Sequence, residues 1–387
     1  MNTNTTVGII GSGAMGAGIA QVAAMAGHNV ILYDNKASAV DKAKTSLNTT
    51  LQKLQEKGKI ANAAEVLQRF TFVSELNALA GCGLIIEAII EKLEIKKAVF
   101  AEVENIVSPD CVLASNTSSL SITSIAAACK NPSRVIGLHF FNPAPLMALV
   151  EIIPAVQTDA ALPPACRQLM ETWGKIPVMA KDTPGFIVNR LARPFYGEAI
   201  RIYEEGIADI ATIDWAMTEI GGFKMGPFAL TDYIGHDVNY IVTETVFQSF
   251  FYDPRYKPSF SQKRLLEAGW LGRKTGRGFY NYAEDVNQPQ PEKDVVVGRY
   301  IFERILAMLI NEAVDALHLN IASAQDLDLA MTKGVNYPKG LLQWCDELGV
   351  EQCLEKLDNL YNEYHEDRYR ASSLLRMMAK NKTKFRQ

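Results

Sequence analysis

Residues 7–34 read VGIIGSGAMGAGIAQVAAMAGHNVILYD. A short apolar run at residues 7–10 leads into a glycine-rich turn, which is followed by a segment rich in alanine and methionine and by a second apolar run that ends at Asp34. This order of strand, turn, helix and strand is typical of a βαβ unit. The chain is therefore expected to open with an α/β fold.

The turn carries Gly11, Gly13 and Gly16 at the spacing GxGxxG. At this spacing the first glycine permits a tight turn, the second lets the backbone approach a pyrophosphate, and the third lets the helix pack on the strand. The helix that follows offers its N-terminal amides and the positive end of its dipole to the phosphates. We therefore predict a dinucleotide site at this turn and count Ala14 and Met15 among its residues.

Asp34 closes the second apolar run, 23 residues after Gly11. A carboxylate at this place accepts hydrogen bonds from the adenosine ribose hydroxyls and repels a 2′-phosphate. The position of Asp34 therefore favours NAD over NADP as the cofactor.

Apolar runs and helical patterns keep alternating up to residue 183, as in GLIIEAII, EKLEIKKAVFAEVENIV, CVLASNTSSLSITSIAAA and RVIGLHFF. This alternation predicts a mostly parallel, doubly wound sheet, and thus a Rossmann-type domain over residues 1–183. Ligands of such sheets bind beyond the carboxyl ends of the strands. The segments SNTSS (115–119) and HFFNP (139–143) directly follow apolar runs, so both are expected to face the cofactor.

His139 is the one imidazole in the run RVIGLHFF, and a histidine in such a place is by default structural. Twelve residues later, Glu151 lies within the apolar segment LMALVEII, where an ionised carboxylate is costly unless it is paired. A buried Glu151 beside His139 would fix the imidazole tautomer and raise its basicity, as a general base requires. The alternative is that Glu151 points to water from an edge strand.

Three further polar residues have both a structural and a functional interpretation. Asn116 and Ser118 lie in SNTSS, where turn and helix-capping roles are common for these residue types. Asn189 lies in DTPGFIVNRLA, where it is either solvated or presents a donor and an acceptor to a cleft. The residues alone leave both interpretations open.

The composition excludes several classes of protein. The net charge is −4 with both signs mixed along the chain, so no basic surface for nucleic acid or an anionic membrane is expected. No apolar run reaches the ~18 residues of a membrane span, and the start of the chain lacks the features of a secretory signal, which favours a cytoplasmic protein. The six cysteines show neither CxxC nor Cys/His ligand spacing and are expected to be reduced, with no metal site.

After Thr183 and Pro184 helical patterns dominate, and the chain repeats itself. Six pairs of identical residues are separated by 114 positions: Glu198 and Glu312, Asp214 and Asp328, Met217 and Met331, Gly226 and Gly340, Asp232 and Asp346, Gly235 and Gly349. Such matches without a gap indicate a duplicated helical module. We place the copies at residues 184–284 and 296–387, joined by the polar stretch AEDVNQPQPEKD. The predicted fold is an α/β Rossmann-type doubly wound domain followed by an all-α region of two tandem helical repeats.

Seven ordered motifs make the chain closely similar to the 3-hydroxyacyl-CoA dehydrogenase family. They are GSGAMGAGIAQ, IIEAIIEKLEIKK, SNTSSLSI, GLHFFNPAPLMALVEI, DTPGFIVNRL, GPFALTDYIGHD and GRKTGRGFYNY, and they cover nearly the whole chain. Bacterial members that act on 3-hydroxybutyryl-CoA or 3-hydroxyadipyl-CoA are the most similar.

This resemblance implies reversible, NAD-dependent oxidation of a short-chain (S)-3-hydroxyacyl-CoA to the 3-oxoacyl-CoA, in fatty acid β-oxidation or aromatic compound catabolism. It implies that His139 is the general base and that Glu151 supports it. Ser118 and Asn189 match positions that hold the reacting oxygen and the thioester region. Positions that contact the cofactor in the family match Asp34, Glu91, Lys96, Asn116, Ser118 and Asn142.

One departure from the family concerns the segment PxMKLVE, where this chain has Ala148 in place of the usual lysine, so the preference for the acyl group stays open. In LQKLQEKGK, Lys53 and Lys57 share one helical face. Related enzymes use lysines of this region to meet the CoA phosphates, so we assign Lys57 to substrate binding, with a solvated helix face as the alternative.

In single-copy members of the family the helical module pairs between subunits. The second copy is therefore expected to take the place of a partner subunit, which predicts a monomer, or a homodimer built on another surface. Three other functions stay open: a dehydrogenase of a free hydroxy acid or sugar acid on the same fold, a protein that binds NAD without catalysis, and a subunit of a larger fatty-acid oxidation assembly. Dependence on CoA separates the first of these from the acyl-CoA reaction.

Overall fold

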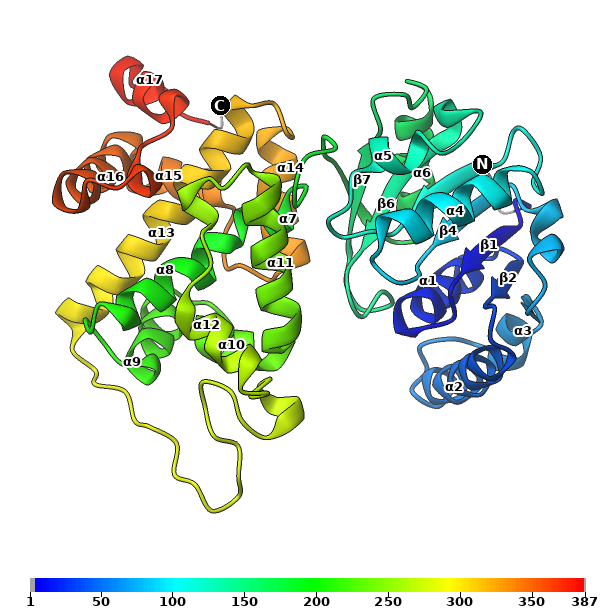
Figure 1. Cartoon of the computed structure of the whole chain (residues 1–387), viewed down its shortest axis with the longest axis horizontal. Helices are drawn as coiled ribbons and strands as arrows, with labels where there is room; N and C mark the ends of the chain where they lie inside the picture. The colour runs from blue at the N-terminus through cyan, green and yellow to red at the C-terminus, as the bar shows by residue number, and fades with distance from the viewer. Residues whose placement is uncertain (1–3, 386–387) are drawn as a thin grey trace. The chain divides into compact units, whose positions relative to one another are not determined.

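The computed structural model describes residues 4–385 and divides into two units, the first ending at Phe186 and the second beginning at Ile187 (Figure 1). The first unit contains the sheet, and the second consists of helices. The predicted succession of a sheet domain and a helical region is therefore confirmed. Among the described residues, no helix combines the length and the apolar character that crossing a membrane requires.

The first unit is built on one eight-stranded sheet with the order β3-β2-β1-β4-β5-β6-β7-β8. The strands are β1 (Val7–Ile10), β2 (Val30–Tyr33), β3 (Phe70–Val73), β4 (Leu84–Glu87), β5 (Val112–Ser115), β6 (Val135–Phe140), β7 (Leu149–Pro154) and β8 (Ile176–Met179). Strands β1 to β6 run parallel, whereas β7 is antiparallel to β6 and parallel to β8. This confirms the mostly parallel, doubly wound sheet.

Helices cover both faces of this sheet. The helices are α1 (Ala14–Met25), α2 (Ala37–Glu56), α3 (Ala63–Leu67), α4 (Leu93–Glu104), α5 (Ile122–Ala126) and α6 (Leu162–Thr172), with short 3-10 turns at Leu76–Gly81 and Pro132–Arg134. Helices α1, α2, α3 and α6 share one apolar core with the strands, and α4 packs on the opposite face through Phe100 and Val103. Because both faces are covered, β1, β4, β5 and β6 are mostly apolar in sequence and are buried along their length.

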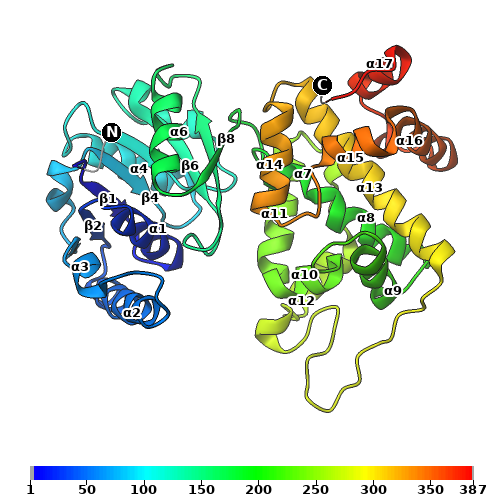
Figure 2. The same cartoon turned by 180° about the vertical axis from the view of Figure 1, so that it is seen from behind.

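The second unit is helical. It contains α7 (Val188–Leu191), α8 (Arg193–Glu204), α9 (Ile210–Trp215), a π-helical turn η3 (Ala216–Ile220), α10 (Pro227–Ile234), α11 (His236–Ser249), α12 (Phe260–Glu267), α13 (Val295–His318), α14 (Ala324–Gly334), α15 (Leu341–Leu348), α16 (Val350–Tyr364) and α17 (Ser373–Asn381). Short 3-10 turns lie at Pro254–Tyr256, Arg273–Thr275 and Asp367–Tyr369. The long helix α13 packs along α8, as Figures 1 and 2 show from opposite sides.

Candidate active site

The glycine-rich turn between β1 and α1 is shaped by close backbone contacts. Gly11 has a φ of +103°, and a Cβ at Gly16 would lie 1.8 Å from the carbonyl oxygen of Gly11. A Cβ at Gly13, by contrast, would meet no atom within 4 Å. Gly13 is also the N-cap of α1 and provides no side-chain cap for the first amides of the helix. The turn thus leaves open space at the helix N-terminus, the place at which the sequence predicts the pyrophosphate of a dinucleotide.

Asp34 lies directly after β2, beside this turn. Its Oδ2 accepts hydrogen bonds from the backbone N–H of Ser12 at 2.9 Å and from the Ser12 hydroxyl at 3.0 Å. Its Oδ1 accepts from the backbone N–H of Lys36 at 3.1 Å. The carboxylate is therefore held at the carboxyl end of the sheet, where an adenosine ribose is expected.

His139 and Glu151 face each other across the one antiparallel pair of strands in the sheet. They are direct register partners in β6 and β7, and Nδ1 of His139 lies 2.6 Å from Oε2 of Glu151. Glu151 is fully buried, and β8 pairs with β7 on its other side. The alternative of an edge-strand carboxylate pointing to water is therefore wrong.

The surroundings of His139 are apolar. The rings of Phe141 and Phe186 lie 4.5 and 6.0 Å from the imidazole ring, and 6% of His139 is exposed. Because the carboxylate of Glu151 accepts a hydrogen bond, Nδ1 carries the proton in the neutral ring. Nε2 is then the nitrogen that can take or return a proton.

Ser118 lies at the carboxyl end of β5, where Glu91 organises the backbone. Oε1 of Glu91 accepts hydrogen bonds from the Thr117 hydroxyl at 2.6 Å and from the backbone N–H of Ser118 at 2.9 Å. Burial raises the pKa of the Glu91 carboxyl, but the nearby Lys96 ammonium and the hydrogen bonds from Thr117 and Ser118 outweigh it and hold that pKa below its usual value. Glu91 is therefore a fixed anion that orients the segment containing Ser118.

Lys96 is buried among carboxylates. Its Nζ lies 2.5 Å from Oε1 of Glu87 and 3.3 Å from Oε2 of Glu91, and its side chain is 1% exposed. Glu87, the last residue of β4, also accepts the Ser115 hydroxyl at 2.6 Å. The sequence interpretation missed Glu87, although a carboxylate that ends the apolar run GLIIE carries the same signal as Glu151.

The loop after β6 is held by two side chains. Oδ1 of Asn116 accepts the backbone N–H of Phe140 at 2.8 Å, while Asn142 is exposed in the loop. Lys175, which the sequence interpretation also missed, donates to the carbonyl oxygens of Ala144 at 2.6 Å and of Met147 at 2.8 Å. Burial lowers the pKa of this ammonium. Lys175 thus places a cation next to Ala148, the position at which the resemblance had implied a lysine.

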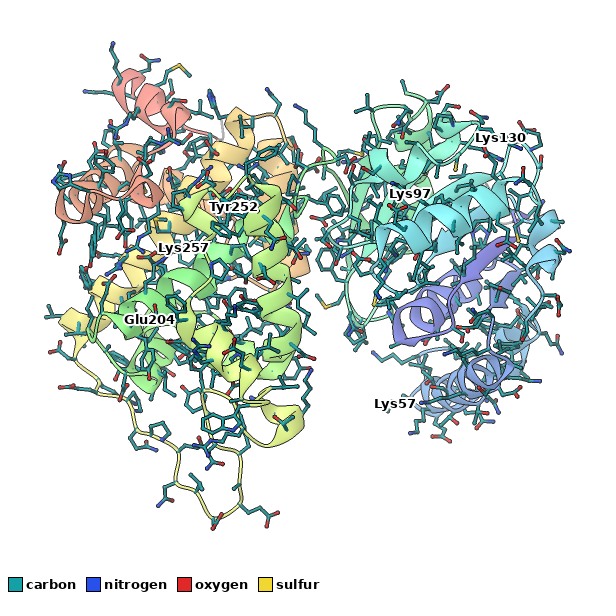
Figure 3. All side chains as sticks on the ribbon, in the orientation of Figure 1. Lys57, Lys97, Lys130, Glu204, Tyr252 and Lys257 are labelled. Carbon is teal, nitrogen blue, oxygen red and sulfur yellow. The ribbon has the colours of Figure 1, made fainter. Side chains whose placement is uncertain are left out.

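The remaining predicted residues lie elsewhere. Lys57 follows the last residue of α2 as its C-cap and is exposed on the surface of the first unit (Figure 3). Asn189 is half-buried on α7, in the second unit. The structure therefore places the turn residues, Asp34, Glu91, Ser118 and His139 at the carboxyl ends of the parallel strands. Glu151 reaches His139 from the antiparallel strand β7, and Lys57 lies on the periphery of that unit.

Comparison with protein families gives two matches. Residues 6–183 match the family model described as 3-hydroxyacyl-CoA dehydrogenase, NAD binding domain. Residues 185–282 and 300–387 both match the model described as 3-hydroxyacyl-CoA dehydrogenase, C-terminal domain.

Individual relatives agree with these matches. The chain is 39% identical to a 3-hydroxyadipyl-CoA dehydrogenase of Escherichia coli, in an alignment that covers 97% of each chain. It is 43% identical to a probable 3-hydroxybutyryl-CoA dehydrogenase of Deinococcus radiodurans over 276 residues, which cover 71% of this chain and 99% of the relative. Among solved structures, a 3-hydroxybutyryl-CoA dehydrogenase from Escherichia coli superposes with a TM-score of 0.93 at 38% identity and covers 98% of this chain and 99% of that chain.

Proposed function

The chain belongs to the 3-hydroxyacyl-CoA dehydrogenase family and is an NAD-dependent oxidoreductase, and from this premise we propose that it reversibly oxidises short-chain (S)-3-hydroxyacyl-CoA thioesters to 3-oxoacyl-CoA. The observation that carries the proposal is the buried contact between His139 and Glu151 at 2.6 Å. A buried imidazole held by a carboxylate is a suitable general base for a substrate hydroxyl.

In the oxidation direction, Nε2 of His139 takes the proton of the substrate hydroxyl while the C3–O bond becomes a carbonyl. When bound, NAD would supply the acceptor for the hydride that leaves C3. Glu151 keeps its charge and stabilises the imidazolium that forms. In the reverse direction the imidazolium returns the proton to the carbonyl oxygen.

We assign the remaining roles by position. Ser118 holds the reacting oxygen, and the Glu91 carboxylate fixes the backbone that carries it. Asn189 contacts the thioester region of the substrate, and Lys57 meets the phosphates of CoA. For NAD, the open space at Gly13 and the carboxylate of Asp34 provide the two contacts that a dinucleotide requires. The substrate names of the relatives point to a 3-hydroxybutyryl or a 3-hydroxyadipyl thioester.

The test follows the absorbance of NADH with purified protein and, in turn, acetoacetyl-CoA, 3-oxoadipyl-CoA and free acetoacetate. We expect oxidation of NADH with the two thioesters and at least ~100-fold lower kcat/KM with the free acid, because the CoA moiety contributes binding energy to the transition state. Equal turnover of free acetoacetate would favour a dehydrogenase of free hydroxy acids. No turnover of either thioester would overturn the proposal.

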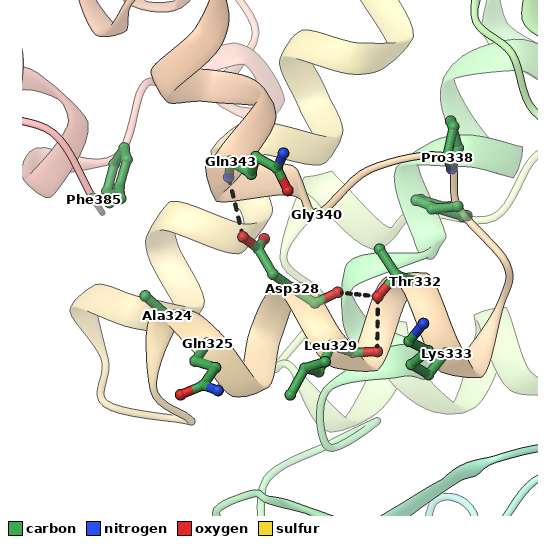
Figure 4. A pocket seen from close by; sticks show the side chains of 11 residues that line it. Ala324, Gln325, Asp328, Leu329, Thr332, Lys333, Pro338, Gly340, Gln343 and Phe385 are labelled. Carbon is green, nitrogen blue, oxygen red and sulfur yellow. Dashed lines mark hydrogen bonds between the residues drawn. The ribbon is translucent and has the colours of Figure 1, made fainter. Parts of the chain in front are cut away.

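We further propose that residues 184–284 and 296–387 are two copies of one helical module, since the same contacts recur 114 positions apart. Asp214 accepts the backbone N–H groups of Phe228 and Ala229 at the start of α10. Asp328 accepts that of Leu342 and, as Figure 4 shows, that of Gln343 at the start of α15. The hydroxyl of Thr218 bonds the carbonyl of Asp214, as the hydroxyl of Thr332 bonds that of Asp328. The double match to the C-terminal family model also supports the proposal.

The contact between the two copies is reciprocal. Arg190 donates to Glu312 at 2.5 Å, and Arg304 donates to Glu198 at 2.7 Å. Both differences in residue number, 304 − 190 and 312 − 198, equal 114. Each copy thus contributes the arginine to one pair and the glutamate to the other. This is the arrangement of a two-fold symmetric dimer interface. We therefore propose that the second copy stands in for a partner subunit, and that the protein is a monomer or a homodimer built on another surface.

A further inference from the structure

Arg193, the first residue of α8, is a buried cation without a carboxylate. Its Nε donates to the carbonyl oxygen of Asn189 at 3.0 Å and its Nη1 to the hydroxyl of Thr243 at 3.1 Å. The guanidinium lies 5.0 Å from the ring centre of Tyr196. Burial lowers the pKa of Arg193, and the neighbouring phenol groups of Tyr196 and Tyr337 offset this effect only in part. Among the described residues, none supplies a carboxylate to this guanidinium.

The other buried arginines of the same unit are paired. Arg190 meets both Glu312 and Asp315, and Arg304 meets both Glu198 and Glu205. These pairs follow the usual rule that a buried charge is compensated by an opposite one. Arg193 departs from this rule although it lies only three residues after Arg190, so its missing counter-ion is a property of that site.

Hydrogen-bond donors are in excess around Arg193. The hydroxyl of Tyr337 and Nδ2 of Asn239 are buried and have no partner among residues 4–385. Asn239 belongs to the same network, because Gln262 donates to its Oδ1 at 2.5 Å and to the Thr243 hydroxyl at 3.3 Å. A buried cation together with unsatisfied donors fits an anion, and the planar fork of a guanidinium fits a carboxylate in particular.

The position of Arg193 connects this anion site to the substrate. Arg193 lies four residues after Asn189 and is bonded to its carbonyl oxygen. One helical turn is ~5.4 Å, which is about the reach of a short acyl chain beyond its C3 carbon. The connection rests on the proposed function, in which Asn189 contacts the thioester region.

We propose that Arg193 binds a carboxylate at the far end of the acyl group, so that the preferred substrates are CoA thioesters of 3-hydroxy dicarboxylic acids. The carboxylate supplies the missing counter-ion and accepts the unsatisfied donors. An uncharged acyl chain of the same length would leave both the cation and these donors unpaired.

The experiment compares two thioesters of equal carbon number, 3-oxoadipyl-CoA and 3-oxohexanoyl-CoA, with the full chain and NADH. In the unmodified protein we expect a kcat/KM at least ~30-fold higher for 3-oxoadipyl-CoA, the range of a charge-assisted hydrogen bond. Arg193→Met should reduce the ratio of the two kcat/KM values to about one, because kcat/KM falls mainly for the charged substrate. Arg193→Lys should retain part of the preference, since it keeps the charge but not the planar fork.

Two further measurements keep the proposal testable if Arg193→Met fails to fold. Adipyl-CoA and hexanoyl-CoA are compared as competitive inhibitors of the unmodified protein, and we expect the charged one to bind at least ~10-fold more tightly. Tyr337→Phe, which removes one unsatisfied donor, should lower the preference for the charged substrate. Equal kcat/KM values for the two substrates, or an equal loss for both in Arg193→Met, would mean that Arg193 only supports the helix. No turnover of either thioester would instead overturn the proposed function, and this inference with it.

Discussion

At the scale of single residues, His139 and His28 differ in their hydrogen-bond partners, although both are buried histidines of the first unit. Nδ1 of His28 donates to the carbonyl oxygen of Thr5, and its Nε2 accepts from the indole of Trp173, each at 2.9 Å. Both nitrogens of His28 are therefore used by the fold. In His139, Nδ1 is held by Glu151, and in the proposed function Nε2 takes the proton. The hydrogen-bond partners, and not the residue type or its burial, therefore distinguish the proposed general base from the structural histidine.

His139→Gln is expected to lower kcat with acetoacetyl-CoA by a factor of ~10²–10⁴, because general acid–base catalysis contributes about that much. Glu151→Gln should lower kcat by a smaller factor, since the imidazole remains but loses the charge that stabilises its protonated form. The affinity for NADH, measured by fluorescence titration, should stay within about twofold in both variants.

His28→Gln is the matched control for this prediction. It removes a buried imidazole that contacts Trp173, so it should lower the melting temperature while leaving the kcat of the folded protein close to that of the unmodified chain. If His28→Gln reduced kcat as strongly as His139→Gln, or if His139→Gln lost NADH binding, the catalytic assignment would fail.

At the scale of elements, the glycines of the β1–α1 turn are present for different physical reasons. Gly16 is required by packing, because a side chain there would overlap the backbone of Gly11. Gly13 has open space around its missing side chain, so packing within the protein does not require a glycine there. In the proposed function, the glycine at this position lets the pyrophosphate approach the backbone.

This difference predicts opposite effects of alanine at the two positions. Gly13→Ala should keep the melting temperature within about 2 °C and weaken NADH binding by ~10-fold or more, because the added methyl group occupies the space of the pyrophosphate. Gly16→Ala should lower the melting temperature as well, because the helix must move away from the strand. Thermal unfolding and NADH fluorescence titration measure both effects. Unchanged NADH affinity in Gly13→Ala would place the phosphates elsewhere.

The two proposed copies of the helical module also differ at the scale of elements. In the first copy, α7 ends at Leu191 and α8 begins at Arg193, whereas the equivalent residues of the second copy lie within the continuous helix α13. Pro194, which cannot donate a backbone hydrogen bond, corresponds 114 positions later to Met308. The proline thus accounts for the break, and the break lies next to Arg193.

At the scale of the whole molecule, the helical unit contains the reciprocal ion pairs Arg190–Glu312 and Arg304–Glu198. Arg304 lies between Glu198 and the hydroxyls of Tyr364 and Tyr369, and Arg190 lies between Glu312 and Asp315. Burial raises the pKa of the Glu198 carboxyl, but Arg201, Arg304 and Arg368 and the hydrogen bond from Tyr369 outweigh it and hold that pKa below its usual value. Glu198 therefore contributes stability above the pKa of an unfolded glutamate, and this contribution is lost as the pH falls through the lower folded value.

Glu198→Gln and Glu312→Gln are expected to destabilise the protein by similar amounts at pH 7, about 2 kcal/mol each, because each removes one of the two carboxylates that compensate a buried arginine. The difference in unfolding free energy between the unmodified chain and Glu198→Gln should shrink below about pH 4, in line with the sign above. Denaturant unfolding at several pH values measures both effects.

Asp358→Asn is the control for these variants, since it removes a salt bridge to Arg376 that is exposed to solvent and should change the stability by less than about 1 kcal/mol. Light scattering adds a second readout. Because the reciprocal pairs lie within one chain, Glu198→Gln should leave the mass in solution unchanged. A homodimer that dissociates in this variant would show that the pairs join two chains and would contradict the proposed role of the second copy.

The sequence by itself determined the family, the βαβ opening, NAD as the cofactor and the succession of a sheet and a helical region. These properties depend on residues near each other in the chain, such as the GxGxxG turn, or on patterns that repeat along it. The sequence also singled out His139 and Glu151, but it left the orientation of Glu151 open.

Only the tertiary structure decided which distant residues meet. The register of β6 and β7 brings His139 to Glu151, the end of β4 brings Glu87 to Lys96, and β8 brings Lys175 to the loop beside Ala148. The absence of a carboxylate from the described surroundings of Arg193 is likewise invisible in a sequence with 43 acidic residues. The physical reason is that periodicity and composition report which residues are buried, whereas the partner of a buried charge is set by strand register and helix packing.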